Sequence, residues 1–366
     1  MRVERIKGWV LIVALVALAV VAAWKVEDLG GTSRRSLESR PKKMMGTSCR
    51  IIAVPGHATD ARAAASEAGR ALQQAESALR QVEAEMSSYI DASALSRLNA
   101  APAHQPVPLP PAVLGMLKTS QDLHAQTRGA FDVTCRPLIE LWRRAGELGR
   151  LPSDADIDRA RRASSWASLE LGEKTALKSS RTVRVDLGGI AKGHGIDRAV
   201  QVLREAGMAG GLVDVGGDLR AFGAPPQGQA WEVKIQDPMS SGTIVTLEMG
   251  DGAVCTSGGY HRYVTIGGRR YSHIIDPRTG QPAQAVASAT VLAADATTAD
   301  VWATALSVVG EKGLAWLPRN VEALLVVGTQ EEPRSVLTPG MKKKIVAGPA
   351  YPVSDQKGDG AGRVAP

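Results

Sequence analysis

The sequence predicts an α+β protein in which mixed β-sheets are flanked by helices. The first half of the chain shows helical periodicity, above all over residues 58–85, where alanine and leucine recur at helical spacing. The second half has short runs that alternate apolar and polar residues, such as 231–235 and 243–249, which is typical of strands. Between them, residues 183–207 combine a short apolar run, paired glycines and an amphipathic helix. The rest of the chain is interpreted around this central stretch.

The beginning of the chain has the pattern of a membrane anchor. Arg2, Arg5 and Lys7 precede the uncharged residues 8–24, and such basic charges hold the start of the chain on the cytoplasmic side. A cleaved signal peptide is the alternative, but no small-residue cleavage pattern clearly follows the apolar run, so a retained anchor is favoured. Residues 25–44 are polar and contain Gly and Ser, which indicates a tether that lifts the following domain off the membrane.

The basic charge of the chain is confined to its two ends. The formal net charge is +7, yet residues 1–44 hold nine Lys or Arg against four acids, and residues 339–366 hold five against two. The middle is therefore close to neutral, and with two Phe and five Tyr it offers little aromatic surface for bases, which argues against nucleic-acid binding. Cys49, Cys135 and Cys255 are too few and too scattered for a zinc site or a disulfide framework.

One strand and several helices are expected before the central stretch. Ser93 is a candidate N-cap for one short helix. The segment Gly-Ala-Phe-Asp-Val-Thr at 129–134 sets one of the two phenylalanines beside an acid, and the structural interpretation is that Phe131 is a core residue and Asp132 a helix cap. The expected elements are a strand at 47–54, a long helix at 58–85, a proline-rich connection at 102–111, a helix at 112–126, and a helix with a hairpin-like pair at 152–181.

In the central stretch, the end of a predicted strand leads directly into the N-terminus, or mouth, of a predicted helix. Gly188 and Gly189 follow the apolar run, and glycine lets the backbone approach a ligand closely. The free N–H groups of the first helical turn favour an anion such as a phosphate, and Lys192 would add a positive charge there. The structural alternative is a corner that needs glycine for its geometry alone, and the spacing matches neither common nucleotide fingerprint.

A second copy of the pattern follows the helix. Residues 212–218 again place an acid, an apolar residue and two glycines after a strand. Two such strands around one helix predict a strand–helix–strand unit with parallel strands whose glycine-rich ends emerge on the same side. Ligands commonly lie at such ends.

Most of the remaining chain is expected to be strand. Further strands are predicted at 243–249, 254–259 and 286–294, together with a hairpin at 263–275 around Gly267 and Gly268. The hairpin runs into His273 and an exposed loop, Asp-Pro-Arg-Thr-Gly, at 276–280.

An acid and a hydroxyl lie four residues apart near the start of a predicted helix. Asp300 and Thr304 can therefore present oxygens on the same side of the helix, and a hard cation such as Mg²⁺ prefers such ligands supplemented by phosphate and water. For an isolated pair of this kind the simpler interpretation is an acid that complements the helix N-terminus and a threonine that faces solvent.

Taken together in this order, these motifs resemble the ApbE family of FAD:protein FMN transferases. The resemblance covers nearly all of 45–327, and its strength lies in many motifs at suitable separations. The matching segments are 45–47, 86–99, 129–134, 185–197, 213–218, 256–258, 273–280 and 297–304.

The resemblance implies an ApbE-like fold with an FAD cleft between subdomains. It also implies that FAD is a substrate whose FMN half is transferred, through a phosphoester bond, to a threonine of a target protein with release of AMP. The implied organisation is an anchor or signal sequence at 1–24, a tether at 25–44, a flavin transferase domain at 45–338 and a flexible tail at 339–366. The implied flavin contacts are Met45, Tyr89, Ala130, Phe131, Asp132, Asp186, Lys192 and Ile274.

The same resemblance implies a metal site and a base. Magnesium would be held by the backbone carbonyl of Gly189 and the side chains of Asp300 and Thr304. His273 matches a motif histidine that could serve as general base, with a structural bond to a loop carbonyl as the alternative. The sequence departs from the family pattern at His194, where an aromatic residue is frequent, and in having an anchor in place of a lipid attachment.

The expected setting is the bacterial inner membrane, with the catalytic domain on the periplasmic side. The family implies acceptors among flavin-carrying electron-transport subunits or exported reductases. Two alternatives stay open: a Mg²⁺-dependent FAD pyrophosphatase that releases FMN and AMP, and an FAD-binding protein without turnover.

Overall fold

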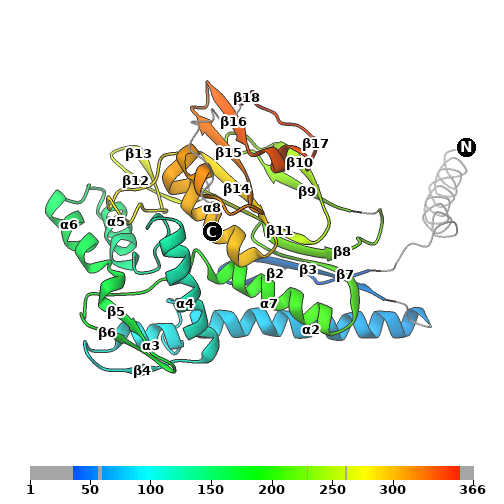
Figure 1. Ribbon diagram of the computed structural model, residues 1–366, viewed down its shortest axis with the longest axis horizontal. Coiled ribbons are helices and arrows are strands. Elements are labelled where there is room, and N and C mark those ends of the chain that lie inside the picture. The colour runs from blue at the N-terminus through cyan, green and yellow to red at the C-terminus, as the bar shows by residue number, and fades with distance from the viewer. Residues whose placement is uncertain (1–35, 57–59, 229, 260–261, 355–366) are drawn as a thin grey trace, which may run out of the picture.

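The centre of the molecule is a ten-stranded sheet (Figure 1). The computed structural model describes residues 36–56, 60–228, 230–259 and 262–354. Neighbouring strands of this sheet are antiparallel except β16 and β18. In spatial order it contains β1 (Leu37–Glu38), β3 (Thr47–Pro55), β7 (Met208–Val215), β8 (Asp218–Gly223), β11 (Gly252–Gly258), β14 (Ser288–Ala293), β15 (Glu322–Gly328), β16 (Pro333–Leu337) and β18 (Val353–Ser354), with β2 (Lys42–Met44) beside β3.

The two faces of this sheet bury different layers. One face packs on α2 (Ala61–Met86), α7 (Ala191–Glu205) and α8 (Ala296–Val309), and the other on a three-stranded sheet of β17 (Ile345–Ala347), β10 (Thr243–Met249) and β9 (Trp231–Gln236). Alternation along the strands separates the layers: Val213 of β7 joins the helical core, and Leu212 joins the core under the small sheet. This arrangement leaves α7 and α8 side by side on one face.

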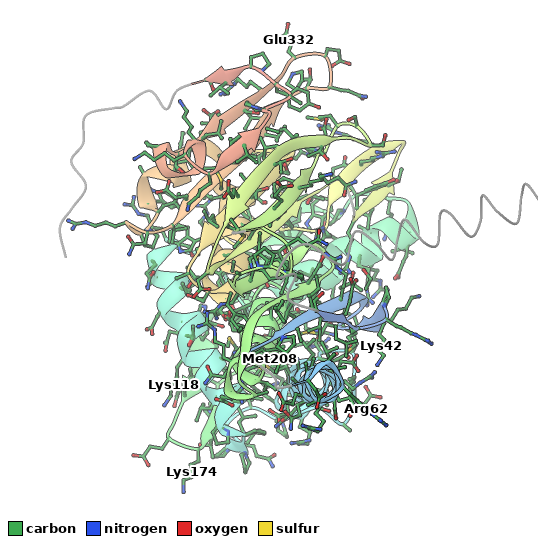
Figure 2. The ribbon with its side chains drawn as sticks, turned by 90° about the vertical axis from the view of Figure 1, so that its right-hand side faces the viewer. Lys42, Arg62, Lys118, Lys174, Met208 and Glu332 are labelled. Carbon is green, nitrogen blue, oxygen red and sulfur yellow. The ribbon has the colours of Figure 1, made fainter. Side chains whose placement is uncertain are left out.

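The side view in Figure 2 shows how far the sheet extends. Lys42, in β2, lies near one end, and Glu332, in the turn between β15 and β16, lies at the other. The N-cap of α2 is Asp60, whose carboxylate accepts hydrogen bonds from the backbone N–H groups of Arg62 and Ala63 at 2.8 and 2.7 Å. Ser93 caps α3 (Ala94–Ala100) by accepting from the Ser96 N–H, as the sequence predicts.

A helical lobe stands beside this sheet (Figure 1). Its own small core joins α5 to α6 and to a hairpin, through residues such as Leu138, Trp142 and Ile157. The lobe's elements are α4 (Pro111–Gln126), α5 (Arg136–Leu148), α6 (Asp154–Ala163), the 3-10 turn η2 (Trp166–Ser168), the sheet of β4 (Val107–Pro108), β6 (Thr175–Lys178) and β5 (Leu169–Leu171), and the hairpin of β12 (Tyr263–Ile266) and β13 (Arg269–Ser272).

The prediction of a parallel strand–helix–strand unit is wrong. Residues 183–187 form an extended segment with a single parallel bridge between Arg184 and Cys135, and they are not part of the large sheet. β7 instead pairs antiparallel with both β3 and β8. Gly216 and Gly217, both at positive φ, form the two-residue turn between β7 and β8. The local pattern identified the turn residues but held no information on the pairing partner.

The folded region extends beyond the expected limits at both ends. β1 and β2 pair with β3 within the residues assigned to a tether. Within the residues assigned to a tail, α9 (Pro339–Lys342) follows β16, β17 pairs with β10, and β18 pairs with β16. The 3-10 turn η3 (Gly310–Trp316) completes the elements between α8 and β15.

The expected anchor at 1–24 and the start of the tether lie outside the described residues. Among the residues that are described, no helix has the length and apolarity needed to cross a bilayer. Cys49, Cys135 and Cys255 are all free thiols.

Candidate active site

The mouth of α7 holds a group of charges that we call the acid–lysine cluster: Lys192, whose side chain is 29% exposed, and the buried acids Asp218 and Asp300. The Lys192 ammonium bonds to Asp218, and its distance to Asp300 Oδ1 is 3.0 Å. Asp300 and Asp218 are almost fully buried, and the Thr256 N–H donates to the second oxygen of Asp218 at 2.9 Å. The three side chains come from α7, β8 and α8, so the cluster joins three elements that are distant in sequence.

The charges in this cluster do not cancel. Burial opposes the charge of Lys192, but Asp218 and Asp300 outweigh it and raise the pKa of Lys192. Burial also raises the pKa of Asp300, against the opposing effect of Lys192. Two carboxylates share one ammonium, so the cluster can accept further positive charge.

A close helix crossing fixes Asp300 relative to α7. A Cβ on Gly193 would overlap the carbonyl of Ala296, so only glycine allows α8 to approach this closely. The Gly193 N–H then donates to Asp300 Oδ2 at 3.1 Å. A backbone donor at the start of α7 thus directs the acid of the neighbouring helix.

Asp197 anchors the first turn of α8. Its two oxygens accept from the N–H groups of Ala296 and Thr297 at 2.8 and 2.9 Å, and Arg220 pairs with it at 2.6 Å. The N-cap of the helix is Asp295, which accepts from the Thr298 N–H. These bonds set the position of Asp300 one turn later.

Gly189 and Thr304 lie together, as the metal hypothesis requires. A Cβ on Gly189 would be 3.4 Å from Thr304 Oγ1 and 3.2 Å from the Phe131 ring. Ser257 Oγ lies 3.4 Å from Thr304 Oγ1 and adds a hydroxyl at the end of β11. The backbone at Gly189 therefore meets the Asp300 side of α8, one turn beyond the acid.

The oxygen atoms at this point fit a hard cation. Asp300 contributes a carboxylate, Thr304 a hydroxyl and Gly189 a backbone carbonyl, the donor types that Mg²⁺ takes alongside substrate phosphate and water. The residual negative charge of the acid–lysine cluster favours a cation there. Within the described ranges, no three His, Cys, Asp or Glu side chains gather as a metal cage, so the phosphate would have to supply ligands of its own.

Asp186 lies on the other side of the Gly188–Gly189 turn. Arg136 pairs with it at 3.0 Å, the Ser88 hydroxyl donates to it at 3.0 Å, and the Gly188 N–H donates to it at 2.8 Å. The Arg136 guanidinium also lies 5.6 Å from the ring centre of Tyr89, a ring that is 77% exposed. Two expected flavin contacts, Tyr89 and Asp186, are thus joined by Arg136.

The turn at 129–134 packs against the same segment. The Asp186 N–H donates to the Val133 carbonyl at 2.7 Å, and Phe131 and Ala130 are buried. Asp132 accepts from the N–H and the hydroxyl of Thr134, both at 2.7 Å, and caps no helix because α5 begins at Arg136. Burial raises the pKa of Asp132.

His273 follows β13 and is open to solvent. Its Nδ1 lies 2.9 Å from the Arg262 carbonyl, so Nδ1 carries the proton in the neutral ring and Nε2 is left to accept one. Desolvation by the surrounding protein, and then the charges of Arg262 and Lys192, lower the pKa of His273 even though part of the ring keeps contact with water. The next residue, Ile274, is buried.

Met45 is the expected contact that lies furthest along α7. It has a positive φ of 52° and packs against Gly195, where a Cβ would be 3.0 Å from its sulfur. The structure therefore gathers Met45, Gly189, Lys192, Asp300 and Thr304 around α7 and α8. Phe131 meets Gly189 there, and Asp186 bonds to the Gly188 N–H.

Sequence reasoning missed three residues of this arrangement. Asp218 lies within a noted motif but was given no role, and Asp197 was likewise inside one. Arg136 carries no local signal, because its partner Asp186 is 50 residues away in the chain.

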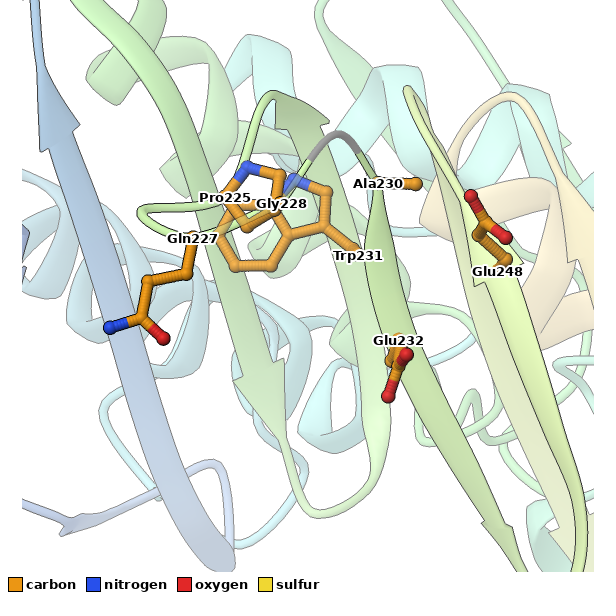
Figure 3. Close-up of a pocket in the computed structure, with 7 residues that line it drawn as sticks. All are labelled: Pro225, Gln227, Gly228, Ala230, Trp231, Glu232 and Glu248. Carbon is orange, nitrogen blue, oxygen red and sulfur yellow. The ribbon is translucent and has the colours of Figure 1, made fainter. Parts of the chain in front are cut away.

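A separate hollow of about 350 Å³ lies on the small sheet (Figure 3). It follows the end of β8 at Gly223, whereas Asp218 begins that strand, so the hollow is at the opposite end from the acid–lysine cluster. Its lining includes Trp231, Glu232 and Glu248. Nothing in the expected site falls within it.

Comparisons with known proteins identify the family of the chain. The model of the ApbE family matches residues 45–325. An FAD:protein FMN transferase from Vibrio cholerae is 36% identical over 260 residues, which are 69% of this chain and 78% of the relative. One from Treponema pallidum is 31% identical over 322 residues, 82% of this chain and 87% of the relative.

Solved structures give the same result. The flavin transferase ApbE from Vibrio cholerae has a TM-score of 0.73 at 29% identity and covers 85% of this chain and 100% of its own. The ApbE protein from Thermotoga maritima has a TM-score of 0.75 at 28% identity and covers 85% and 99%.

Proposed function

The chain belongs to the ApbE family, and from this premise we propose that it is an FAD:protein FMN transferase. It takes FAD and an acceptor protein as substrates, attaches FMN to a threonine through a phosphoester bond and releases AMP. The observation that carries the proposal is the meeting of Gly189 with Thr304 beside the acid–lysine cluster. Segments more than 100 residues apart in the chain meet there, which supports placing the pyrophosphate at this point.

The proposed binding mode places the pyrophosphate of FAD at the mouth of α7, in a cleft between the large sheet with its helices and the helical lobe. The N–H groups of the first turn and the Lys192 ammonium oppose its negative charge. The flavin lies toward Tyr89, Phe131 and Asp186. Support comes from the exposed Tyr89 ring, a large flat surface that a bound flavin could cover.

We place one Mg²⁺ at Gly189, Asp300 and Thr304. When bound, the ion would neutralise charge on the pyrophosphate and make its phosphorus easier to attack. Lys192 remains paired with Asp218 and holds the second side of the anion. The donor types and the excess negative charge of the cluster support this assignment.

His273 is proposed as the general base. The threonine oxygen forms a bond to the FMN phosphorus, the bond from that phosphorus to the bridging oxygen breaks, and AMP leaves with the bridging oxygen. The threonine proton passes to Nε2 of His273. The Nδ1 contact with the Arg262 carbonyl supports this role because it leaves Nε2 unprotonated.

The proposed setting is the periplasmic face of a bacterial inner membrane, with residues 1–24 as the anchor. Acceptors would be exported subunits of flavin-carrying electron-transport complexes or reductases. The run of uncharged residues after Arg2, Arg5 and Lys7 supports this setting.

The deciding experiment is mass spectrometry of a candidate acceptor after incubation with this protein, FAD and Mg²⁺. The expected result is one FMN added on a threonine and an equal amount of AMP. A parallel incubation without acceptor should release little FMN. Steady release of FMN and AMP in that control, with no labelled acceptor, would favour the pyrophosphatase instead.

A further inference from the structure

The hairpin of β12 and β13 is a two-stranded sheet of its own, and it leads directly into His273. Its strands pair Tyr263 with Ser272 through to Ile266 with Arg269, and Gly267 and Gly268 form the turn at φ 57° and 77°. In Figure 1 the hairpin lies at the edge of the molecule above α5, and within the described part of the chain neither strand pairs with a third.

The pairing pattern determines which backbone groups face outward. The His273 N–H donates to the Arg262 carbonyl, so that pair is hydrogen-bonded. In an antiparallel ladder hydrogen-bonded and open pairs alternate. Arg270 and Ser272 therefore point their N–H and C=O groups away from β12. Among the described residues, no backbone hydrogen bond joins these outward groups to another strand or to a loop.

α5 covers one face of the hairpin and lies nearer β12 than β13. α5 approaches β12 so closely that a Cβ on Gly146 would lie 2.6 Å from Val264. Tyr271 of β13 stacks on Trp142 with 5.4 Å between ring centres, which holds the hairpin against α5 by one face. On the β13 side, Gly259 packs against Ser272, with 3.1 Å between a Cβ on Gly259 and the Ser272 Cβ, while the outward backbone groups of Arg270 and Ser272 have no backbone partner among the described residues. β13 is the strand that continues into the proposed base.

The hairpin also carries uncompensated positive charge. Arg262, Arg269 and Arg270 lie within residues 262–272, a stretch without Asp or Glu. None of the three forms an ion pair with a carboxylate in the described residues, whereas Arg278 in the following loop is paired with Asp276. Arg270 instead lies over the ring of Tyr263 at 4.5 Å. An extended segment that carries acids would complement this edge.

We propose that the edge of β13 binds the threonine-bearing segment of the acceptor protein as an added β-strand. This inference rests on the proposed function. His273 lies three positions after Arg270, a distance of about 10 Å along a strand, so a segment of that length joined at Arg270 reaches the base. Main-chain hydrogen bonds hold the segment, and the arginines select acidic residues near the threonine.

Strand addition at the edge of β13 would determine which acceptor segments can bind. Because backbone groups carry the affinity, acceptors with different side chains can share the edge provided that the segment is extended. Proline at the position opposite Arg270 would remove a needed N–H group from the acceptor.

Proline substitutions at the two edges give a matched test. Arg270→Pro removes the outward N–H of β13, and Thr265→Pro removes the outward N–H of β12; both leave the ladder bonds inside the hairpin in place. The probes are an electron-transport subunit from the same organism that carries phosphoester-linked FMN, prepared free of flavin, and a labelled peptide spanning its threonine. Thermal unfolding and FAD affinity of each variant report whether the protein is folded and its FAD site intact.

The expected result is that Arg270→Pro weakens peptide binding, measured by fluorescence anisotropy, and raises the acceptor KM by at least about tenfold, the scale of a lost edge hydrogen bond with its steric block. Thr265→Pro should change either quantity less than about twofold, and Arg270→Gln, which keeps the N–H, should show an intermediate effect that diminishes at high salt.

Two outcomes would overturn the inference: a folded Arg270→Pro protein with unchanged peptide affinity, or equal losses in the Arg270→Pro and Thr265→Pro proteins. The binding measurement needs no chemistry, so it separates this inference from the proposed function. A wild-type protein that binds the peptide at this edge and transfers no FMN would contradict the proposed function alone.

Discussion

The acid–lysine cluster and the hairpin that ends at His273 are two parts of the proposed site, and they have opposite physical character. The two carboxylates of the cluster are buried, and its charges lie on three elements of the main fold. The hairpin is exposed, pairs with no other strand among the described residues, and rests on the helical lobe. The difference fits two substrates: a dinucleotide whose pyrophosphate must be screened from water, and a protein segment that must arrive from solvent.

This contrast predicts how variants should separate. Changes in the cluster should abolish chemistry for every acceptor, because they act on the phosphate. Changes at the hairpin should leave FAD binding unaffected and should weaken acceptor binding or slow the removal of the acceptor's proton.

The largest effect is expected for Asp300→Ala. The substitution removes the one carboxylate proposed to hold Mg²⁺ and leaves Lys192 paired with Asp218. FMN attachment to a co-expressed acceptor should fall by about 10³-fold or more, the scale of losing a key electrostatic group at a reacting phosphate. Asp300→Asn is the isosteric comparison, and it should fail nearly as fully because it removes the charge and keeps the shape.

The readout is the fraction of acceptor that carries FMN, with circular dichroism to confirm folding. Normal attachment by a folded Asp300→Ala protein would show that the metal assignment is wrong.

His273→Ala should slow transfer by about 10²-fold or more and leave FAD affinity within about twofold, since a general base contributes to the chemical step. His104 offers a control: it is exposed, it has a positive φ of 63°, and His104→Asn preserves a residue type that tolerates that backbone. Single-turnover transfer and FAD fluorescence quenching measure the two quantities separately. Equal losses of binding and transfer in His273→Ala would remove its role as base.

Transfer should also decline in acid with a midpoint below pH 6.5, the ordinary value for histidine. Desolvation and the charges of Arg262 and Lys192 lower the pKa of His273, so the neutral ring that accepts a proton persists to lower pH and is lost only below that pKa. Arg262→Gln keeps the backbone carbonyl and removes one charge, so the midpoint should move upward. A kcat profile from about pH 5 to 8 at saturating acceptor tests both statements; an identical midpoint in the two proteins would contradict the assignment to His273.

The sequence predicts the local elements of this molecule well, because their signals are local. Ser93 caps α3, and the alternation at 243–249 coincides with β10. The residues of the proposed metal site could also be named from the sequence, since Asp300 and Thr304 are four apart on α8 and Gly189 belongs to a motif.

What the sequence could not supply is pairing over distance. The turns Gly188–Gly189 and Gly216–Gly217 look alike, yet one opens a helix and the other closes an antiparallel hairpin. Asp218 was missed because its partner Lys192 is 26 residues away and the third member, Asp300, is 108 residues from that lysine. Sequence periodicity carries no information on such long-range contacts, which form only when the chain folds.

The smallest effect is expected at the hollow on the small sheet. The hollow belongs neither to the acid–lysine cluster nor to the hairpin, so variants there test how far the proposed site extends. Glu232 and Glu248 are directly opposite each other on β9 and β10, and like charges in that position repel (Figure 3). Glu248→Gln should therefore stabilise the protein by about 0.2–1 kcal/mol and leave FMN transfer unchanged. Adding Glu232→Gln should bring little more, because the first substitution already removes the repulsion. Thermal unfolding measures the stability of both variants, and the transfer assay measures their activity. A loss of transfer in either variant would mean that the active site extends to this end of β8.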